Sequence, residues 1–161
     1  MKLTLCAVGR LGATVENNLA RDYLKRADLT GRGLGLTPVE LLEVEAKNAK
    51  NLSSAQLKAS EAEAIRAALG EGVLITCDEH GEHLTSRQIA QRLEAFKDRG
   101  ERRVTFLIGG ADGLDQALLK ASAFSLAFGR ATWPHALVRA MLAEQIYRAT
   151  TILAGLPYHR D

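Results

Sequence analysis

Residues 104–115, VTFLIGGADGLD, decide the fold of this chain. The run Val104–Ile108 is apolar with β-branched residues at both ends, which is typical of a strand buried in a parallel sheet. The strand ends at Gly109–Gly110, where the absence of side chains lets the backbone turn tightly and approach a ligand closely. Taken alone, GGADG is a weak motif, because a tight turn from strand to helix without any ligand has the same composition.

On both sides of this strand, short apolar runs alternate with amphipathic stretches. Strands are expected at Lys2–Val8, Val39–Glu45, Val73–Cys77, Val104–Ile108 and Ser125–Phe128. Helices are expected at Val15–Arg26, at Ser54–Leu69, between Thr85 and Gly100, from Asp115 to Ala121, and at Pro134–Leu153. This alternation predicts an α/β fold with a mainly parallel sheet of about five strands flanked by helices. The imperfect apolar alternation of Val39–Glu45 favours a place near the sheet edge.

Capping residues set the expected helix ends. Ser53 with Gln56 and Thr85 with Gln88 match the capping box, and Asp115 is a third N-cap candidate. Gly100 suits a C′ position and Pro134 a first helical turn. Two helices have the 3.6-residue period of an amphipathic helix. In the helix expected at Val15–Arg26 the period is marked by Val15, Leu19, Tyr23 and Leu24. In the helix expected at Pro134–Leu153 the residues expected to be buried are Leu137, Val138, Met141, Leu142, Ile146 and Leu153.

Composition bounds the class of protein. With 161 residues, 47% hydrophobic and 25% charged, the chain is sized for a single globular domain spanning residues 1–161. A formal net charge of +2 is too small to indicate nucleic-acid binding. Cys6 and Cys77 lie in apolar runs without metal-ligand spacing, which favours buried, reduced thiols. No run is long enough to span a bilayer and no signal peptide is recognisable, so we expect a cytoplasmic protein without membrane contact.

Glycine motifs exclude the commonest nucleotide-binding folds. The first strand ends in VGRLG, which is G-x-x-G rather than G-x-G-x-x-G, and G-x-x-x-x-G-K-[ST] is absent. Ligands of open α/β sheets collect outside the carboxyl ends of the strands. Three such ends have unusual sequences here: Cys77–Asp78, Gly109–Gly113 and Phe128–Trp133. The segment DEHGEHL, with His80 and His83, raises the hypothesis of a metal site, but without a third cluster of ligands we expect no metal.

Five segments recur in this order and spacing in one known family: ITCD, FLIGGADGL, SLAFGRATWPHALVR, EQIYRA and the terminal PYHRD. In these the chain resembles the SPOUT-class methyltransferases that modify N3 of a pseudouridine in large-subunit (23S) ribosomal RNA. The similarity covers the whole chain, with the specific motifs after residue 73. It implies S-adenosyl-L-methionine as methyl donor, rRNA within the ribosome as acceptor, a homodimer and a C-terminal trefoil knot. Neither periodicity nor composition predicts a knot, which is rare among folds.

The resemblance also assigns residues to two halves of a site. The family's cofactor pocket falls on Cys77, Gly110, Phe128, Gly129, Arg130, Ala131, Thr132 and Trp133. An aliphatic residue is common at the position of Cys77, so the cysteine is a departure to which we assign no chemistry. The candidates for catalysis and acceptor binding are His135, Arg139, Tyr158, His159 and Arg160.

The implied reaction moves a sulfonium methyl in line to an imide nitrogen, which is a weak nucleophile until its proton leaves. We therefore expect His159 or Tyr158 near that proton, and Arg160 and Arg139 on phosphate or uracil oxygens. Two arrangements stay open: the tail acts beside the cofactor of its own chain or, in a dimer, beside the cofactor of the other chain. The alternative for His135 is a structural role, as a hydrogen-bonding residue at a helix N-terminus. The alternative for the terminal PYHRD is an ordinary frayed chain end.

Two other functions stay open at this level. The first is a non-catalytic RNA-binding α/β module of the ribosome or of its assembly, in which the same loops bind RNA. The second is a small-molecule enzyme that uses a metal at His80 and His83.

Overall fold

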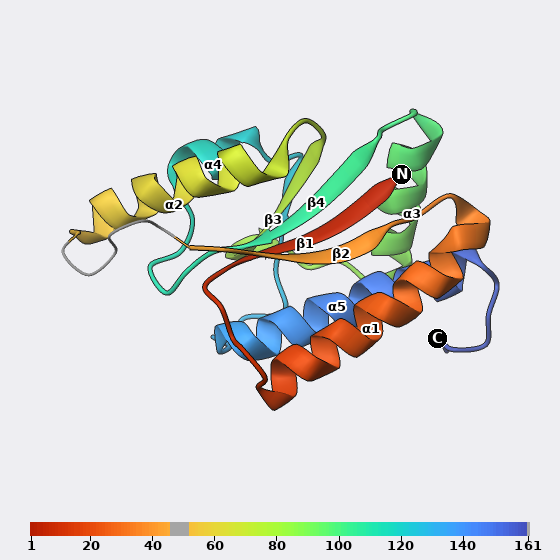
Figure 1. Ribbon diagram of the computed structural model, residues 1–161. Coiled ribbons are helices and arrows are strands. Elements are labelled where there is room, and N and C mark those ends of the chain that lie inside the picture. Colours follow the sequence, from red (N-terminus) through yellow and green to blue (C-terminus); the bar gives the residue numbers. More distant parts are fainter. Residues whose placement is uncertain (46–51, 161) are drawn as a thin grey trace.

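The computed structural model describes residues 1–45 and 52–160 (Figure 1). The strands are β1 (Lys2–Val8), β2 (Val39–Val44), β3 (Val73–Glu82), β4 (Arg103–Ile108) and β5 (Phe124–Leu126). The helices are α1 (Val15–Gly31), α2 (Ser54–Leu69), α3 (Ser86–Asp98), α4 (Gln116–Ala121) and α5 (His135–Leu153), with a short 3-10 helix η1 (Arg32–Leu34) after α1. Of the polar connection between the second strand and α2, positions 46–51 lie outside the described residues.

The five strands form one sheet in the order β2-β1-β4-β3-β5, and every neighbouring pair is parallel. The predicted α/β fold is therefore confirmed, and so is the edge position of β2. The strand that opens the GGADG segment, β4, lies in the middle of the sheet. Because all strands point the same way, the ends of β1, β3, β4 and β5 meet at one edge.

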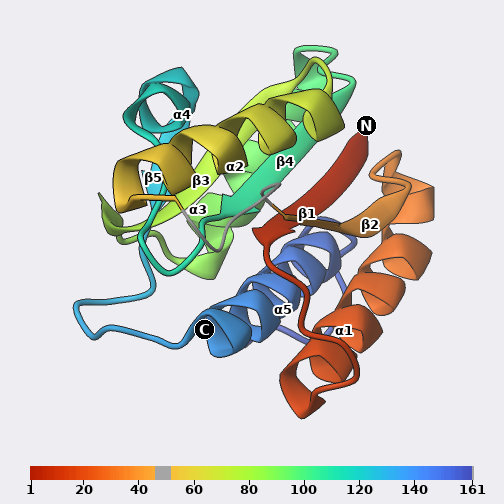
Figure 2. The same ribbon diagram turned by 60° about the vertical axis from the view of Figure 1, so that its left-hand side comes forward.

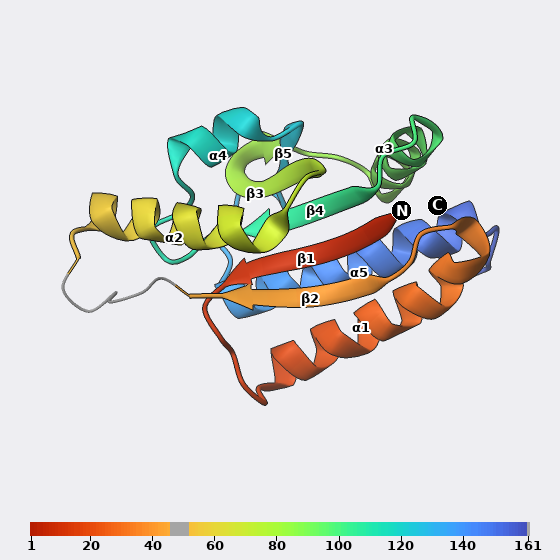
Figure 3. The ribbon, with the colours of Figure 1, turned by 45° about the horizontal axis from the view of Figure 1, so that its top comes forward.

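Helices cover both faces of the sheet. Figures 1 and 3 show α2 and α4 on one face and α1 with α5 on the other, and α3 packs against α5. Each face has its own apolar core. Under α1, α3 and α5 the fully buried residues include Leu5, Phe106, Ile75, Leu93, Leu142 and Ile146; under α2 and α4 they include Cys6, Ile65 and Leu107. Complete burial of one such large side chain stabilises the fold by roughly 1.5–3 kcal/mol.

The expected caps form as the sequence indicates. Ser53 with Gln56 and Thr85 with Gln88 make complete capping boxes, and the Asp115 carboxylate accepts a hydrogen bond from the Ala117 amide. Pro134 differs slightly, because it is the N-cap of α5 and the first helical residue is His135. Within the described residues, none of the helices is long and apolar enough to cross a membrane.

The predicted end of β3 at Cys77 is wrong, because the strand continues to Glu82. After a register shift, Glu82 pairs with Leu126 of β5, and the backbones meet closely at Gly81. A Cβ on Gly81 would lie 2.7 Å from the Ser125 carbonyl, so the close approach requires glycine. The sequence did not predict this pairing, because the polar residues DEHGE lack the apolar pattern of a strand. Two further predicted boundaries also differ: α1 runs to Gly31, and β5 is Phe124–Leu126.

Two predicted inner faces are also partly wrong. In α5, Leu137 is 40% exposed, whereas Leu142 and Ile146 are buried as expected. In α1, Val15 and Leu19 are exposed although they follow the helical period. The first turns of both helices therefore carry apolar side chains that this chain alone does not cover.

Gly100 allows a direct test of backbone strain. It follows the C-cap of α3 with φ +79°, and a Cβ there would meet no atom within 4 Å. Gly100→Ala should therefore lower the free energy of unfolding by about 1–2 kcal/mol through the left-handed conformation alone. The control is Gly33→Ala, where space is equally open and φ is not positive, with an expected change within about 0.5 kcal/mol. Urea unfolding of both variants measures the difference, and equal effects would contradict this explanation.

Candidate active site

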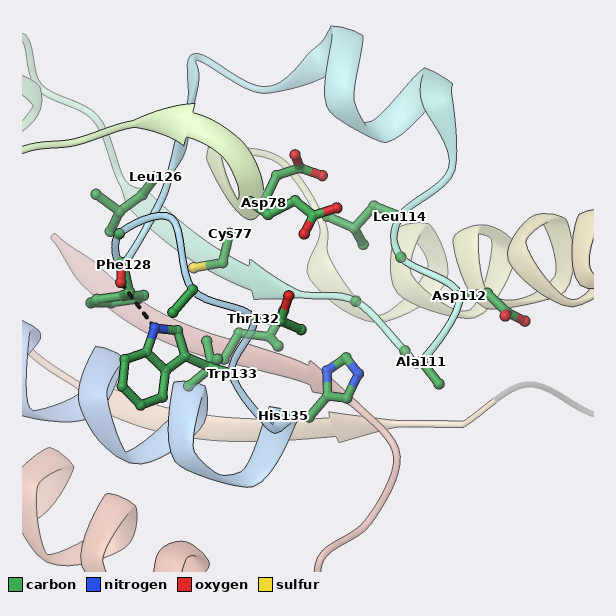
Figure 4. A pocket seen from close by; sticks show the side chains of 18 residues that line it. Cys77, Asp78, Ala111, Asp112, Leu114, Leu126, Phe128, Thr132, Trp133 and His135 are labelled. Carbon is green, nitrogen blue, oxygen red and sulfur yellow. Dashed lines mark hydrogen bonds between the residues drawn. The ribbon is translucent and has the colours of Figure 1, made fainter.

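A pocket of about 350 Å³ opens at the carboxyl edge of the sheet (Figure 4). It is built from the three segments singled out in the sequence, which are Cys77–Asp78 within β3 and the loops after β4 and β5, together with the first turn of α5. The lining residues are Cys77, Asp78, Glu79, Ile108, Gly109, Gly110, Ala111, Asp112, Gly113, Leu114, Leu126, Phe128, Gly129, Ala131, Thr132, Trp133, His135 and Val138. The rule that ligands collect at strand ends thus locates the cavity from the sequence.

The turn after β4 forms the floor of the pocket. The Gly113 amide donates to the Gly110 carbonyl at 3.0 Å, which closes a four-residue turn. A Cβ on Gly109 would lie 2.9 Å from the Leu114 side chain, so only glycine fits there. Gly113 has φ +81°, a left-handed conformation that favours glycine. The turn therefore exposes backbone rather than side chains to a ligand.

The loop after β5 forms the opposite wall. The Trp133 indole N–H donates to the Phe128 carbonyl at 3.0 Å, which ties the two ends of the loop together (Figure 4). Gly129, at φ +94°, makes the turn between them. Trp133 is 42% exposed, a large solvent contact for the single tryptophan of the chain. Its ring is thus available to stack against a ligand.

The charges on the pocket wall are negative. Asp78, Glu79 and Asp112 line it, and none of its lining residues in the described part of the chain is Lys or Arg. A cavity of this kind repels phosphate and favours a cation. Apolar surface comes from Ile108, Leu126 and Val138, so the pocket combines an apolar wall with an acidic mouth.

Cys77 lies in this pocket as a protonated thiol. Burial, followed by the charge of Asp78, raises its pKa to about 12. A thiol is nucleophilic only as the thiolate. Cys77 is therefore a small wall residue, which agrees with assigning it no chemistry.

The structure brings together most of the residues expected to bind the cofactor. Seven of the eight line the pocket: Cys77, Gly110, Phe128, Gly129, Ala131, Thr132 and Trp133. Arg130 is exposed on the same loop and is not a lining residue. Sequence reasoning singled out the segments that hold Asp78 and Asp112, but it gave these carboxylates and Glu79 no role in the pocket.

The five acceptor-side residues do not gather in one place. His135 lines the pocket at the start of α5. Arg139, one turn further, is only 1% exposed; its guanidinium pairs with Glu43 and donates to the Gly9 carbonyl at 3.0 Å. Hydrogen bonds from the Leu11 amide and Arg139, with the charges of Arg139 and Arg21, outweigh burial and lower the pKa of Glu43. In this arrangement Arg139 connects three segments of the interior and has no surface for RNA.

The C-terminal tail folds back onto α5. The Tyr158 hydroxyl donates to Glu144 at 3.0 Å, and the Arg148 guanidinium lies 4.7 Å above the Tyr158 ring. Arg148 also contacts His159 Nδ1 at 3.3 Å, while Arg160 is exposed. Burial first, then hydrogen bonding with Tyr23 and Glu144, raises the pKa of Tyr158 well above its ordinary value. The tail is therefore held in place, and Tyr158 stays a neutral phenol.

The histidines of the DEHGEHL segment gather no ligand set. Both His80 and His83 are exposed, and His80 is bonded to Asp78 through its own amide and ring. In the part of the chain that the structure describes, no three His, Cys, Asp or Glu side chains are grouped to hold a metal ion.

Sequence comparison assigns the class of protein. A family model described as "Predicted SPOUT methyltransferase" matches residues 1–159, so the chain belongs to the SPOUT methyltransferase family. The solved structure of a probable methylase family protein from Haemophilus influenzae Rd KW20 has the same fold. It aligns with a TM-score of 0.52 and 14% identity over 99% of this chain and 70% of that one.

Several relatives that share one name align with this chain over nearly their full length. "Ribosomal RNA large subunit methyltransferase H" of Caulobacter vibrioides is 55% identical, with 100% of this chain and 99% of the relative aligned. The protein of the same name from Phenylobacterium zucineum is 52% identical over all of both chains, and that from Dinoroseobacter shibae 50% over 99% of each.

Proposed function

We propose that the protein transfers the methyl group of S-adenosylmethionine to N3 of a pseudouridine in large-subunit ribosomal RNA. The observation that carries this proposal is the 55% identity, over the full chain, with a ribosomal RNA large subunit methyltransferase. The pseudouridine N3 specificity rests on the resemblance of the motifs after residue 73. The acceptor would be rRNA within the ribosome, which places the enzyme in the cytoplasm.

The pocket suits the proposed cofactor by its chemistry. S-adenosylmethionine carries a positive sulfonium, and three carboxylates with no lining Lys or Arg favour a positive ligand. The apolar wall and Trp133 would enclose the adenine, and the backbone of the turn at Gly110 would supply hydrogen bonds. We keep Arg130 outside the cofactor contacts because it lies beyond the pocket wall.

The bound cofactor would supply an electrophilic methyl group, and the chain would prepare the nucleophile. The N3–H proton must leave as the N3–methyl bond forms, while the sulfonium becomes a neutral thioether. Since Tyr158 stays protonated and its hydroxyl donates to Glu144, we assign His159 as the base and Tyr158 as a residue that positions the tail. Arg160, which is exposed, would contact an RNA phosphate. His135, at the pocket wall, would orient the base.

This assignment requires a second copy of the chain. The tail is attached to Glu144, which lies nine residues, or about 13 Å, along α5 from His135 at the pocket. In Figure 1 the segment that follows α5 lies toward the far end of α5 from its first turn. The tail of one protomer thus points away from its own pocket. A homodimer that pairs each tail with the partner's pocket would complete the site. The trefoil knot that the family resemblance implies stays part of this proposal.

An apolar face is available for that dimer. The helices α1 and α5 lie side by side (Figure 2), and a groove between them is lined by Leu19, Tyr23, Phe128, Leu137, Ala140, Met141, Glu144 and Gln145. Leu19 and Leu137 are 45% and 40% exposed. The groove continues the proposed active site, because Phe128 lines both cavities. Covering this face with a second copy would remove its apolar surface from water.

Charge on this face should prevent the dimer. Leu137→Glu would bury a carboxylate without a partner in the proposed interface, so the variant should elute as a monomer at micromolar concentration. Size-exclusion chromatography with light scattering measures this. The control is Leu29→Glu, because Leu29 is also exposed on α1, at 55%, but lies outside the groove. A dimeric Leu137→Glu variant would place the interface elsewhere.

A methyl-transfer assay tests the whole proposal. Purified protein and labelled S-adenosylmethionine should methylate ribosomes whose rRNA carries the pseudouridine, and ribosomes with uridine at that position should accept no label. Absence of transfer to any ribosomal particle or naked rRNA, together with absence of cofactor binding, would favour a non-catalytic RNA-binding module instead.

A further inference from the structure

Behind the turn that forms the pocket floor lies a carboxylate without a bonding partner. Glu61, on α2, is 9% exposed, and it forms no hydrogen bond or salt bridge within the described residues. Buried charged groups are normally paired, because an isolated charge is costly to remove from water. An unpaired buried carboxylate would therefore be stabilised by a positively charged ligand.

The position of Glu61 points to the pocket. Its Oε1 and Oε2 atoms lie 2.9 and 3.1 Å from the place that a Cβ on Gly110 would occupy. Gly110 lines the pocket, whereas Glu61 does not. The carboxylate thus sits directly behind the wall, and only a glycine backbone separates the two. A Cβ at position 110 would displace the carboxylate from this place.

The electrostatic setting of Glu61 differs from that of the carboxylates at the pocket mouth. Glu79 and Asp112 are exposed, so water and salt screen their charges. Glu61 is only 9% exposed, so water and salt screen its charge less. Burial, and then repulsion from Asp112, raise its pKa, and the charge of Lys58 opposes this only in part. A cation on the other side of Gly110 would stabilise the ionised carboxylate.

We propose that Glu61 is a specificity-determining residue that makes the pocket prefer the sulfonium donor, S-adenosylmethionine, over its thioether product, S-adenosylhomocysteine. This inference rests on the proposed function. In the transfer the sulfur–methyl bond breaks, its electron pair stays on sulfur, and the ligand loses one positive charge. The attraction from Glu61 therefore disappears with the reaction. The product then leaves and the next donor binds, although both ligands present the same adenosine and amino-acid groups.

Affinities of the two ligands test the proposal. Emission from Trp133, the single tryptophan, reports binding at the pocket wall. Glu61→Gln keeps the shape of the side chain and removes its charge. It should weaken S-adenosylmethionine at least about fivefold, the order of effect that Coulomb's law gives for one charge across a glycine backbone at an effective dielectric constant of about 20 to 40. Binding of S-adenosylhomocysteine should change less than about twofold. The control is Glu63→Gln, on the solvent side of α2, with neither affinity changed.

A second measurement needs no variant. Salt at about 0.5 M screens the exposed carboxylates but not a buried one, so the wild-type preference for the donor should persist from low to high salt. Loss of the preference in salt, equal weakening of both ligands by Glu61→Gln, or unchanged affinities would each overturn the role of Glu61. Failure of the wild-type protein to bind either ligand would instead overturn the proposed function, and with it this inference.

Discussion

Replacing His159 with alanine is expected to lower the rate of methyl transfer by about a hundredfold or more, the range for loss of a general base. Binding of S-adenosylmethionine should stay within about twofold, because His159 lies on the tail and not on the pocket wall. Single-turnover transfer to ribosomes and Trp133 fluorescence measure the two quantities. The control is His83→Ala. His83 is exposed and lies outside the proposed pocket, tail and dimer face, so this variant should leave the transfer rate and cofactor binding unchanged.

A mixing experiment separates action within one chain from action across the dimer. Co-assembly of His159→Ala protomers with Gly110→Val protomers gives heterodimers that hold one intact pocket and one intact tail, on different chains. A valine at 110 would displace the Glu61 carboxylate and add a branched side chain to the pocket wall, so it should spoil its own pocket. If tails act on the partner's pocket, transfer should return in the mixture. If the mixture stays inactive while each variant still dimerises, the tail does not act across the dimer.

Tyr158 should respond differently from His159. As a neutral phenol that donates to Glu144, it contributes a hydrogen bond and the placement of the tail rather than a basic site. The contacts of Glu144 and Arg148 with Tyr158 and His159 hold this part of the tail against α5, where most chain ends fray. The sequence alone cannot predict this arrangement, because charges on a helix face pair with solvent as readily as with a tail.

Much of the fold could be predicted from residue patterns. Apolar runs located all five strands, and capping boxes at Ser53 and Thr85 located two helix starts, because these signals are local. The second half of β3 escaped prediction because its pairing with β5 depends on a neighbour 44 residues away, between Glu82 and Leu126. The apolar period likewise predicted which side chains line one stripe of a helix. The apolar period could not predict that Leu19 and Leu137, which belong to these stripes, are left exposed by this chain.

The site could be predicted only in part, for the same reason. Strand ends and glycines marked the pocket, since they depend on sheet geometry. Glu61 could not be found from sequence: it lies in an ordinary helical stretch, and only the packing of α2 against the turn at Gly110 gives it a place at the site. Arg139 is the opposite case, because the family resemblance suggested a ligand contact and the structure places its side chain in the interior.

Removal of the Arg139 guanidinium should therefore destabilise the protein. Arg139→Met keeps the apolar stem but leaves Glu43, whose side chain is 16% exposed, without its main cation and the Gly9 carbonyl without a donor. Breaking a buried ion pair in this way costs about 3–5 kcal/mol, and Arg21, at 3.3 Å from Glu43, should keep the loss near the lower end. Urea unfolding measures the effect. The double variant Arg139→Met/Glu43→Leu removes both charges and should recover at least about 1 kcal/mol of the loss.

The change of stability with pH provides a second test of the Arg139–Glu43 ion pair. The pKa of Glu43 is lowered in the folded protein from 4.5, so its ion pair stabilises the fold above that pH. This contribution is lost as the pH falls through the lowered folded value. In Arg139→Met the folded and unfolded pKa values of Glu43 should move together, and the part of the acid destabilisation due to Glu43 should shrink. If Arg139 instead served mainly to bind RNA phosphate, the variant would keep its stability at every pH. It would lose ribosome binding, with a weaker salt dependence.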